Sequence, residues 1–139
     1  MATLSQLLER LQSINIAKEF EEAFNEQAYY AEDLNVMQLM EGMGGDGPMP
    51  YYSDESVTRY GKPYGRIRLY ETGDFYKGIT YKAEGDTIKA FSTDKKNDYL
   101  EEFYMEYAPV KLTDESKKDM ASMVQSKMAE NIGNKTGLK

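Results

Sequence analysis

The stretch Tyr70-Glu71-Thr72-Gly73-Asp74-Phe75-Tyr76-Lys77 lies at the middle of the 139-residue chain, inside the part predicted to form a β-sheet. A charged, strand-like segment, 65–69, leads into it, and the alternating run 78–83 follows. Its Thr-Gly-Asp centre predicts a tight turn, because glycine accepts a left-handed backbone and short polar side chains hydrogen-bond locally. The aromatic pair behind the turn, Phe75 and Tyr76, supplies a packing anchor. We therefore predict a structural corner whose two aromatic side chains pack on opposite sides of a sheet, one of them toward a neighbouring subunit.

An antiparallel hairpin is predicted directly after this corner. Apolar side chains occupy alternate positions at Phe75, Ile79, Tyr81 and Ala83, which is the period of a half-buried strand. Glu84-Gly85-Asp86 supplies the turn, and the segment 87–92 returns as the partner strand. Beyond it, Thr93 or Asp94 is expected to cap a short helix over 98–104.

The N-terminal third has the periodicity of amphipathic helices. The first apolar stripe contains Leu4, Leu7, Leu8 and Leu11, and Thr3 with Gln6 matches a capping box. The period slips at 13–15, so two helices with a break and one kinked helix both fit the pattern. The second stripe contains Ile16, Phe20, Ala23, Phe24 and Ala28, with Glu19, Glu21, Glu22 and Glu26 on the other side, and it continues toward Met40.

The C-terminal helix has the clearest boundaries. Thr113 is a good N-cap residue, and the acidic pair Asp114-Glu115 in the first turn complements the helix dipole. The buried stripe contains Met120, Met123, Val124, Met128 and Ile132. Gly133 is expected to end the helix, and the residues after it are expected to form a tail without structure of its own.

These patterns predict an α+β fold, with a small antiparallel β-sheet flanked by N-terminal helices and a C-terminal helix. We expect one domain, 1–139, made of a helical region (1–41), an irregular loop (42–65), a β-sheet region (66–92), a second helical region (97–132) and a tail (133–139). The loop is rich in glycine and proline, which stop helices and strands. It lacks the Gly-Lys-Ser/Thr of a phosphate-binding loop, and Glu41 and Asp46 lack the alternating oxygen ligands of a calcium loop.

Composition excludes several kinds of chemistry. The chain contains no histidine and no cysteine, so an imidazole base, a thiolate nucleophile and a zinc site built on these residues are excluded. Neighbouring carboxylates, Glu101-Glu102 and Asp114-Glu115, do not face each other on a helix and are expected to be surface charges. We therefore expect no catalytic residues, no cofactor and no metal. The absence of cysteine fits a reducing cytoplasm, the N-terminus lacks the pattern of a signal peptide, and no apolar run approaches the roughly 20 residues of a membrane span.

The net charge of −7 argues against nonspecific binding to duplex DNA. The chain has 12 tyrosines and 9 methionines, residues that suit adaptable contact surfaces as well as a small core. The local positive group contains Arg59, Lys62, Arg66 and Arg68, and it could meet an acidic face of an adjacent copy. The expected subunit interface consists of Tyr51, Tyr52, Arg59, Tyr60, Arg66 and Arg68. The expected structural turn consists of Thr72, Gly73, Asp74, Phe75 and Tyr76. The charged run 94–98 is expected to be a solvated turn with a helix cap.

The order of features over residues 34–132 resembles a known family. Asn35-Val36-Met37-Gln38-Leu39 precedes the Gly-rich loop, and Pro50-Tyr51-Tyr52-Ser53 follows it. A Lys/Gly/Pro segment at 60–65 leads to the Leu69-Tyr70-Glu71-Thr72-Gly73 turn, the strand pair and a last helix opened by Leu112-Thr113-Asp114-Glu115. This series is similar to the small virion-morphogenesis proteins of tailed bacteriophages, the tail-completion or neck components. The chain departs from many relatives at Tyr107-Ala108-Pro109-Val110-Lys111, where they carry a Phe-Gly or arginine-containing segment.

The resemblance implies a structural, non-enzymatic subunit that forms a homo-oligomeric ring at the junction of head and tail. Such a ring completes the tail and joins it to the head, contacts other neck and tail proteins, and lets DNA pass without specific binding. The implied location is the virion, after assembly in the host cytoplasm, with no membrane contact.

Two other functions fit parts of the sequence. A small acidic phage-encoded interaction or inhibitor protein, a possible nucleic-acid mimic, fits the net charge, although a mimic requires one dense acidic face. A hydrolase built on carboxylates has the least support.

Overall fold

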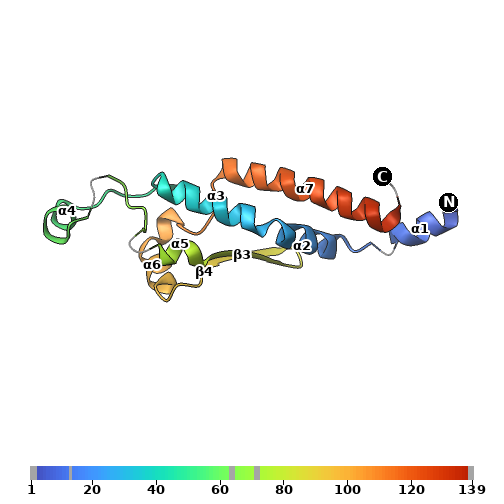
Figure 1. The fold of residues 1–139 in the computed structure, drawn as a ribbon, viewed down its shortest axis with the longest axis horizontal. Helices are drawn as coiled ribbons and strands as arrows, with labels where there is room; N and C mark the ends of the chain where they lie inside the picture. Colours follow the sequence, from blue (N-terminus) through green and yellow to red (C-terminus); the bar gives the residue numbers. More distant parts are fainter. Residues whose placement is uncertain (1–2, 13, 63–64, 71–72, 138–139) are drawn as a thin grey trace.

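A computed structural model describes residues 3–12, 14–62, 65–70 and 73–137. Its elements are α1 (Leu4–Gln12), α2 (Ile16–Glu26), α3 (Ala28–Met40), β1 (Met43–Gly44), β2 (Gly47–Pro48), α4 (Asp54–Tyr60), α5 (Asp74–Gly78), β3 (Ile79–Glu84), β4 (Thr87–Ser92), α6 (Asn97–Phe103), the 3-10 turn η1 (Met105–Tyr107) and α7 (Asp114–Thr136). The fold is α+β, as predicted from the sequence. Figure 1 shows an elongated molecule, with α1 projecting at one end and α4 at the other.

The N-terminal third forms three helices, α1, α2 and α3, with a break before α2 and a second break at Gln27. The Thr3 N–H donates to Gln6 Oε1 at 2.9 Å, and the Gln6 N–H donates to Thr3 Oγ1 at 3.2 Å. The predicted capping box is therefore present. Asn15 Oδ1 accepts a hydrogen bond of 3.2 Å from the Lys18 N–H and starts α2 afresh. α7 runs alongside α2 and α3, and the hairpin of β3 and β4 lies on the other side of these two helices (Figure 1).

The hairpin is the predicted one, with Ile79 opposite Ser92 and Glu84 opposite Thr87. Alternate residues of β3 are buried, which confirms the period of two. Its free edge is covered by polar side chains of the helices. The N–H groups of Tyr81, Ala83 and Gly85 donate to Glu32, Asn25 and Glu21 at 3.0, 2.8 and 2.8 Å. Because these groups are satisfied by side chains, no third strand is needed on this edge.

Two amides on one face of α3 connect the helix to the segment that precedes α7. Asn35 is fully buried, and its Nδ2 donates to the Pro109 carbonyl at 2.8 Å while its Oδ1 accepts from the Tyr81 hydroxyl at 2.5 Å. One turn later, Gln38 donates to the Lys111 carbonyl at 2.6 Å and accepts from the Thr113 N–H at 3.0 Å. The two amides therefore place the start of α7 against α3.

The segment predicted as an irregular loop is more ordered than expected. β1 and β2 form a tight hairpin, in which the Gly45 and Asp46 N–H groups donate to the Ala108 and Tyr107 carbonyls at 2.7 and 3.2 Å. Further on, α4 begins at the N-cap Ser53, whose hydroxyl accepts from the Ser56 N–H at 3.1 Å. The glycines and prolines of this region thus allow close packing against the 107–111 segment.

The predicted end of the last helix is wrong. Thr113 caps α7 as expected, but the helix continues through Gly133 to Thr136, and Gly137 takes the left-handed conformation that ends it, with φ +76°. Glu19, predicted on the outer side of α2, is buried and accepts from Lys135 Nζ at 2.6 Å. Lys135 also donates to Glu22 at 2.8 Å. These contacts hold the last turn in place, so the tail predicted from residue 133 does not begin there.

α6 also differs slightly from its prediction. It spans Asn97–Phe103, and its N-cap is Lys96 without a side-chain cap hydrogen bond. Asn97 Oδ1 instead accepts from the Ser92 N–H at 2.8 Å and joins the helix start to the end of β4. The short capping residues Thr93 and Asp94 therefore lie in the turn before the helix.

Candidate functional site

The structural corner folds as a short helix and not as part of a sheet. Gly73 has φ +86° and precedes α5, and Phe75 and Tyr76 are both buried in that helix. The prediction that they pack on opposite sides of a sheet is therefore wrong. Successive residues of a helix point about 100° apart, so two neighbours can both reach one core. Thr72 lies outside the described residues.

The corner is fixed by hydrogen bonds to both of its neighbours in space. The Tyr76 hydroxyl donates to the Arg68 carbonyl at 2.5 Å, and the Tyr70 and Tyr76 rings lie 5.3 Å apart. The Phe75 carbonyl accepts from the Ser92 hydroxyl at 2.8 Å. α5 therefore joins the segment before it to the end of β4.

We expect Phe75→Ala to lower the free energy of unfolding by about 3 kcal/mol, because it removes a buried ring and leaves a cavity. Gly73→Val should also destabilise the fold, since a β-branched residue at φ +86° is strained and its Cβ would lie 3.1 Å from the Tyr70 ring. Urea unfolding measures both effects. The exposed neighbour Lys77 provides the control, and Lys77→Ala should be nearly neutral. Unchanged unfolding in Phe75→Ala and Gly73→Val contradicts the structural role of the corner.

Tyr76 also makes the free energy of unfolding depend on pH in the alkaline range. Burial, aided by the nearby Tyr52 and Tyr70, raises the pKa of Tyr76 to about 12, against the opposing effect of Arg68. A raised pKa means that the folded state holds the proton more tightly. The stabilisation is therefore complete below pH 10 and is lost as the pH rises toward 12.

Between pH 9 and 11.5, we expect the free energy of unfolding of the wild-type protein to fall by about 1–2 kcal/mol more than that of Tyr76→Phe. This free-energy difference allows for screening of the tyrosinate charge by solvent. Urea unfolding at several pH values measures the difference. Parallel pH profiles for the two proteins contradict the assignment to Tyr76.

The predicted interface residues fall into two groups. Tyr51 and Arg66 form an isolated β-bridge, and the Arg66 guanidinium lies 4.5 Å from the centre of the Tyr51 ring. Arg66 Nη1 also donates to the Met49 carbonyl at 2.8 Å. Arg59 and Tyr60 lie on the projecting helix α4, where Arg59 pairs with Glu55 at 2.9 Å. The predicted positive group is thus spread over two segments and is partly neutralised within the chain.

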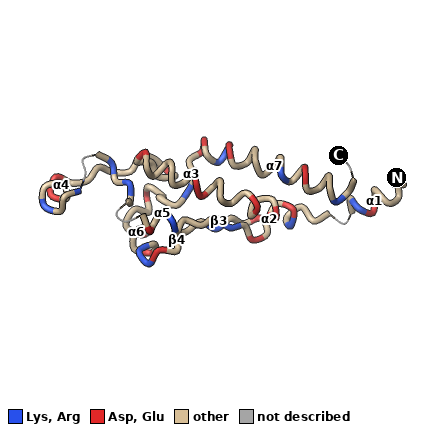
Figure 2. Tube along the Cα trace, viewed as in Figure 1, with Lys and Arg blue, Asp and Glu red and all other residues tan. Residues whose placement is uncertain are grey.

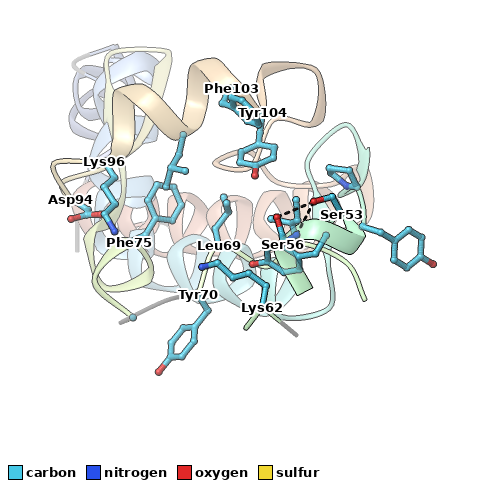
Figure 3. A pocket seen from close by; sticks show the side chains of 16 residues that line it. Ser53, Ser56, Lys62, Leu69, Tyr70, Phe75, Asp94, Lys96, Phe103 and Tyr104 are labelled. Atoms are coloured by element: carbon cyan, nitrogen blue, oxygen red, sulfur yellow. Dashed lines mark hydrogen bonds between the residues drawn. The ribbon is translucent and has the colours of Figure 1, made fainter. Parts of the chain in front are cut away.

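A cavity of about 510 Å³ lies between these segments and α6 (Figure 3). Its walls come from the segment around α4, from 67–70 and 73–75, and from 94–100 and 103–104, and they include Tyr52, Leu69, Phe75 and Tyr104. The hydroxyls of Ser53 and Ser56 bond to each other at 3.0 Å, beside the cap of α4. Burial raises the pKa of Tyr104, and electrostatic interactions with Tyr52 and Tyr99 raise it further. The cavity is therefore an aromatic hollow whose serine hydroxyls support α4.

A second hollow, of about 480 Å³, adjoins the corner. Its lining is Met40, Tyr52, Arg68, Tyr70 and Tyr76. The two hollows share Tyr52 and Tyr70, so they join the structural corner to Tyr51, Tyr52 and Arg68 of the predicted interface. The other predicted interface residues, Arg59, Tyr60 and Arg66, line neither hollow. Sequence reasoning missed the contribution of α6, where Phe103 and the following Tyr104 line the first hollow, because nothing in the local pattern indicates that 97–104 lies beside 50–56.

Comparison with protein-family models, with curated proteins and with solved structures found no match.

Asp46, the candidate calcium ligand of the Gly-rich loop, has another partner. The Asp46 carboxylate accepts from Lys111 Nζ at 2.5 Å. Among the described residues no group of three or more acidic, histidine or cysteine side chains is placed to hold a metal ion. In the same part of the chain, none of the helices has the length and apolar character needed to cross a membrane.

Proposed function

We propose that this chain is a structural, non-enzymatic virion protein of a tailed bacteriophage. It forms a homo-oligomeric ring at the neck or tail end, where it completes the tail and joins it to the head. The ordered motif series over 34–132 supports this proposal, and the α+β architecture agrees with what the resemblance implies. The aromatic surface around α4 and α6 carries the proposal furthest.

That surface exposes more large apolar side chains than a chain acting alone requires. The exposed aromatic and methionine side chains near α4 and α6 are Tyr51, Tyr60, Tyr70, Tyr99, Phe103 and Met105. Tyr60 and Phe103 are 68% and 66% exposed. Contiguous exposed apolar groups mark protein–protein contact sites, and tyrosine and methionine are enriched there. In an elongated subunit, such a surface at one end suits contact with neighbouring neck or tail proteins (Figure 1).

Purified virions provide the test of location. Mass spectrometry should detect the chain in the particles, and imaging of virions with the labelled subunit should place it at the neck or tail end. Absence of the chain from purified particles would contradict the proposal.

A substitution pair tests the aromatic surface itself. Tyr51→Ser with Tyr60→Ser should reduce incorporation into particles while leaving urea unfolding nearly unchanged, because both side chains are exposed. Lys118→Ser, an exposed change on α7, is the matched control and should incorporate normally. Normal incorporation of the double tyrosine variant contradicts a contact through this surface.

The alternative, an acidic inhibitor that mimics nucleic acid, rests on the net charge of −7. Figure 2 shows basic and acidic residues interspersed along the chain. Several carboxylates are neutralised by lysines, as in the pairs Lys89–Glu84 at 3.0 Å and Lys127–Glu26 at 3.3 Å. This distribution favours the structural role. Binding to a basic host protein in a pull-down, without particle association, would favour the alternative.

A further inference from the structure

Within the part of the chain that the structure describes, no apolar partner buries the leucine face of α1. Leu4, Leu8 and Leu11 are 74%, 49% and 44% exposed, although together with Leu7 they form a continuous stripe. α1 touches the end of α7, where Arg10 Nη1 donates to the Thr136 carbonyl at 3.2 Å. A nine-residue helix is marginal in water unless its apolar face packs on something. The capping box and the stripe therefore indicate a helix that is completed by another surface.

The same chain carries an apolar groove of about 510 Å³ between β4 and α7. Phe24 and Val124 are buried at the groove, and Ile88 of β4 lines it while 47% exposed. Lys117 and Gln125 are among its few polar lining residues, and both are exposed on α7. The groove is thus an open extension of the hydrophobic core.

The helix and the groove match in pattern and in length. Grooves that bind amphipathic helices take apolar anchors at i, i+3, i+4 and i+7, the spacing of Leu4, Leu7, Leu8 and Leu11. At 1.5 Å per residue, α1 is about 13 Å long, and the groove-lining part of α7 from Lys117 to Met128 is about 18 Å long. One α1 therefore fits along one groove.

We propose that α1 of one copy of this chain binds in the β4–α7 groove of a second copy. In Figure 1, α1 continues outward past the C-terminal end of α7, so it is presented to a neighbour. Donor and acceptor are different surfaces, which makes the contact heterologous and able to close a ring. This inference rests on the self-assembly in the proposed function and names the contact that joins the subunits.

The size of the contact favours a closed ring over an isolated dimer. A helix about 13 Å long and about 10 Å wide buries about 200 Å² when half of its surface is covered. A stable dimer buries about 800 Å² per partner. A single α1 contact is too small for a stable pair, whereas in a ring every copy both donates and accepts, and the contacts act together.

Disulfide trapping tests the proposal, because the chain has no cysteine of its own. Leu8→Cys marks the helix face and Ala121→Cys marks the groove. The two single variants are mixed and oxidised, and the mixed dimer is quantified by intact mass. Ser126→Cys, exposed on α7 outside the groove lining, replaces Ala121→Cys in the control mixture. We expect at least about tenfold more mixed dimer with Ala121→Cys than with Ser126→Cys, the ratio that corresponds to about 1.4 kcal/mol of preference.

Three outcomes overturn the proposal. They are equal trapping in the two mixtures, no trapping in either, and a disulfide within single chains of the Leu8→Cys/Ala121→Cys double variant at high dilution. The last outcome would place α1 in the groove of its own chain.

As a second measurement, Leu8→Asp should lower the oligomer mass in solution without changing urea unfolding, and an unchanged mass contradicts the proposal. Trapping in a protein that is absent from virions would overturn only the proposed function, and virion incorporation without trapping would overturn only this inference.

Discussion

Replacing Asn35 with alanine is expected to lower the free energy of unfolding by about 4 kcal/mol. The Asn35 side chain is fully buried and joins three parts of the fold: α3, which carries it, β3 through the Tyr81 hydroxyl, and the segment before α7 through the Pro109 carbonyl. Removal of the amide breaks its buried hydrogen bonds with the Tyr81 hydroxyl and the Pro109 carbonyl, and the loss of a partner in the core costs about 1–3 kcal/mol. The missing side-chain volume adds a cavity cost.

Urea unfolding of Asn35→Ala measures this loss. Asp33→Ala, an exposed change in the same helix, is the control and should shift stability by no more than about 0.5 kcal/mol. Tyr81→Phe and the double variant complete a cycle, in which the two losses should not add because they share one hydrogen bond. A loss below about 1 kcal/mol in Asn35→Ala would show that the network contributes little.

Gly44→Ala is expected to destabilise the fold by about 4 kcal/mol or more, because the new methyl group meets backbone and not a flexible side chain. An ideal Cβ on Gly44 lies 2.0 Å from the Tyr107 carbonyl oxygen. The only relief is to separate β1 from the 107–108 segment. That movement breaks the hydrogen bonds from the Gly45 and Asp46 N–H groups described above.

Gly61→Ala is the matched control for this substitution. Gly61 has φ +67° with nothing within 4 Å of an ideal Cβ, so alanine there carries only the backbone cost of about 1–2 kcal/mol. Urea unfolding compares the two variants, and soluble expression is the fallback readout where Gly44→Ala does not fold. Equal stability of the two would contradict the close packing of β1 against the 107–108 segment.

Local signals predicted the elements whose causes lie within a few residues. The capping box of Thr3 and Gln6, the N-cap Thr113 and the Gly85 hairpin turn depend on hydrogen bonds over three or four positions, which the sequence displays directly. The candidate site was predictable only in part. Tyr51 and Arg66 were both expected at an interface, but their direct contact comes from the antiparallel bridge between two segments.

The corner shows where a local pattern is insufficient. A turn followed by alternating apolar residues predicts a strand, and Phe75 fits that alternation. The buried hydrogen bond between the Ser92 hydroxyl and the Phe75 carbonyl belongs instead to a helical turn that packs on the end of β4. Because that partner is 17 residues away, the local pattern does not favour the helix.

By itself, the sequence determined the α+β class, the amphipathic helical character of the N-terminal region, the β3–β4 hairpin and the start of α7, because periodicity and caps act locally. Only the tertiary structure decided which polar side chains are buried. Asn35 and Gln38 find partners 74 and 73 residues away, and Glu19 pairs with Lys135 at a separation of 116 residues. A polar side chain is stable in a core only where such a partner is brought to it, and that condition depends on how the elements pack rather than on neighbouring residues.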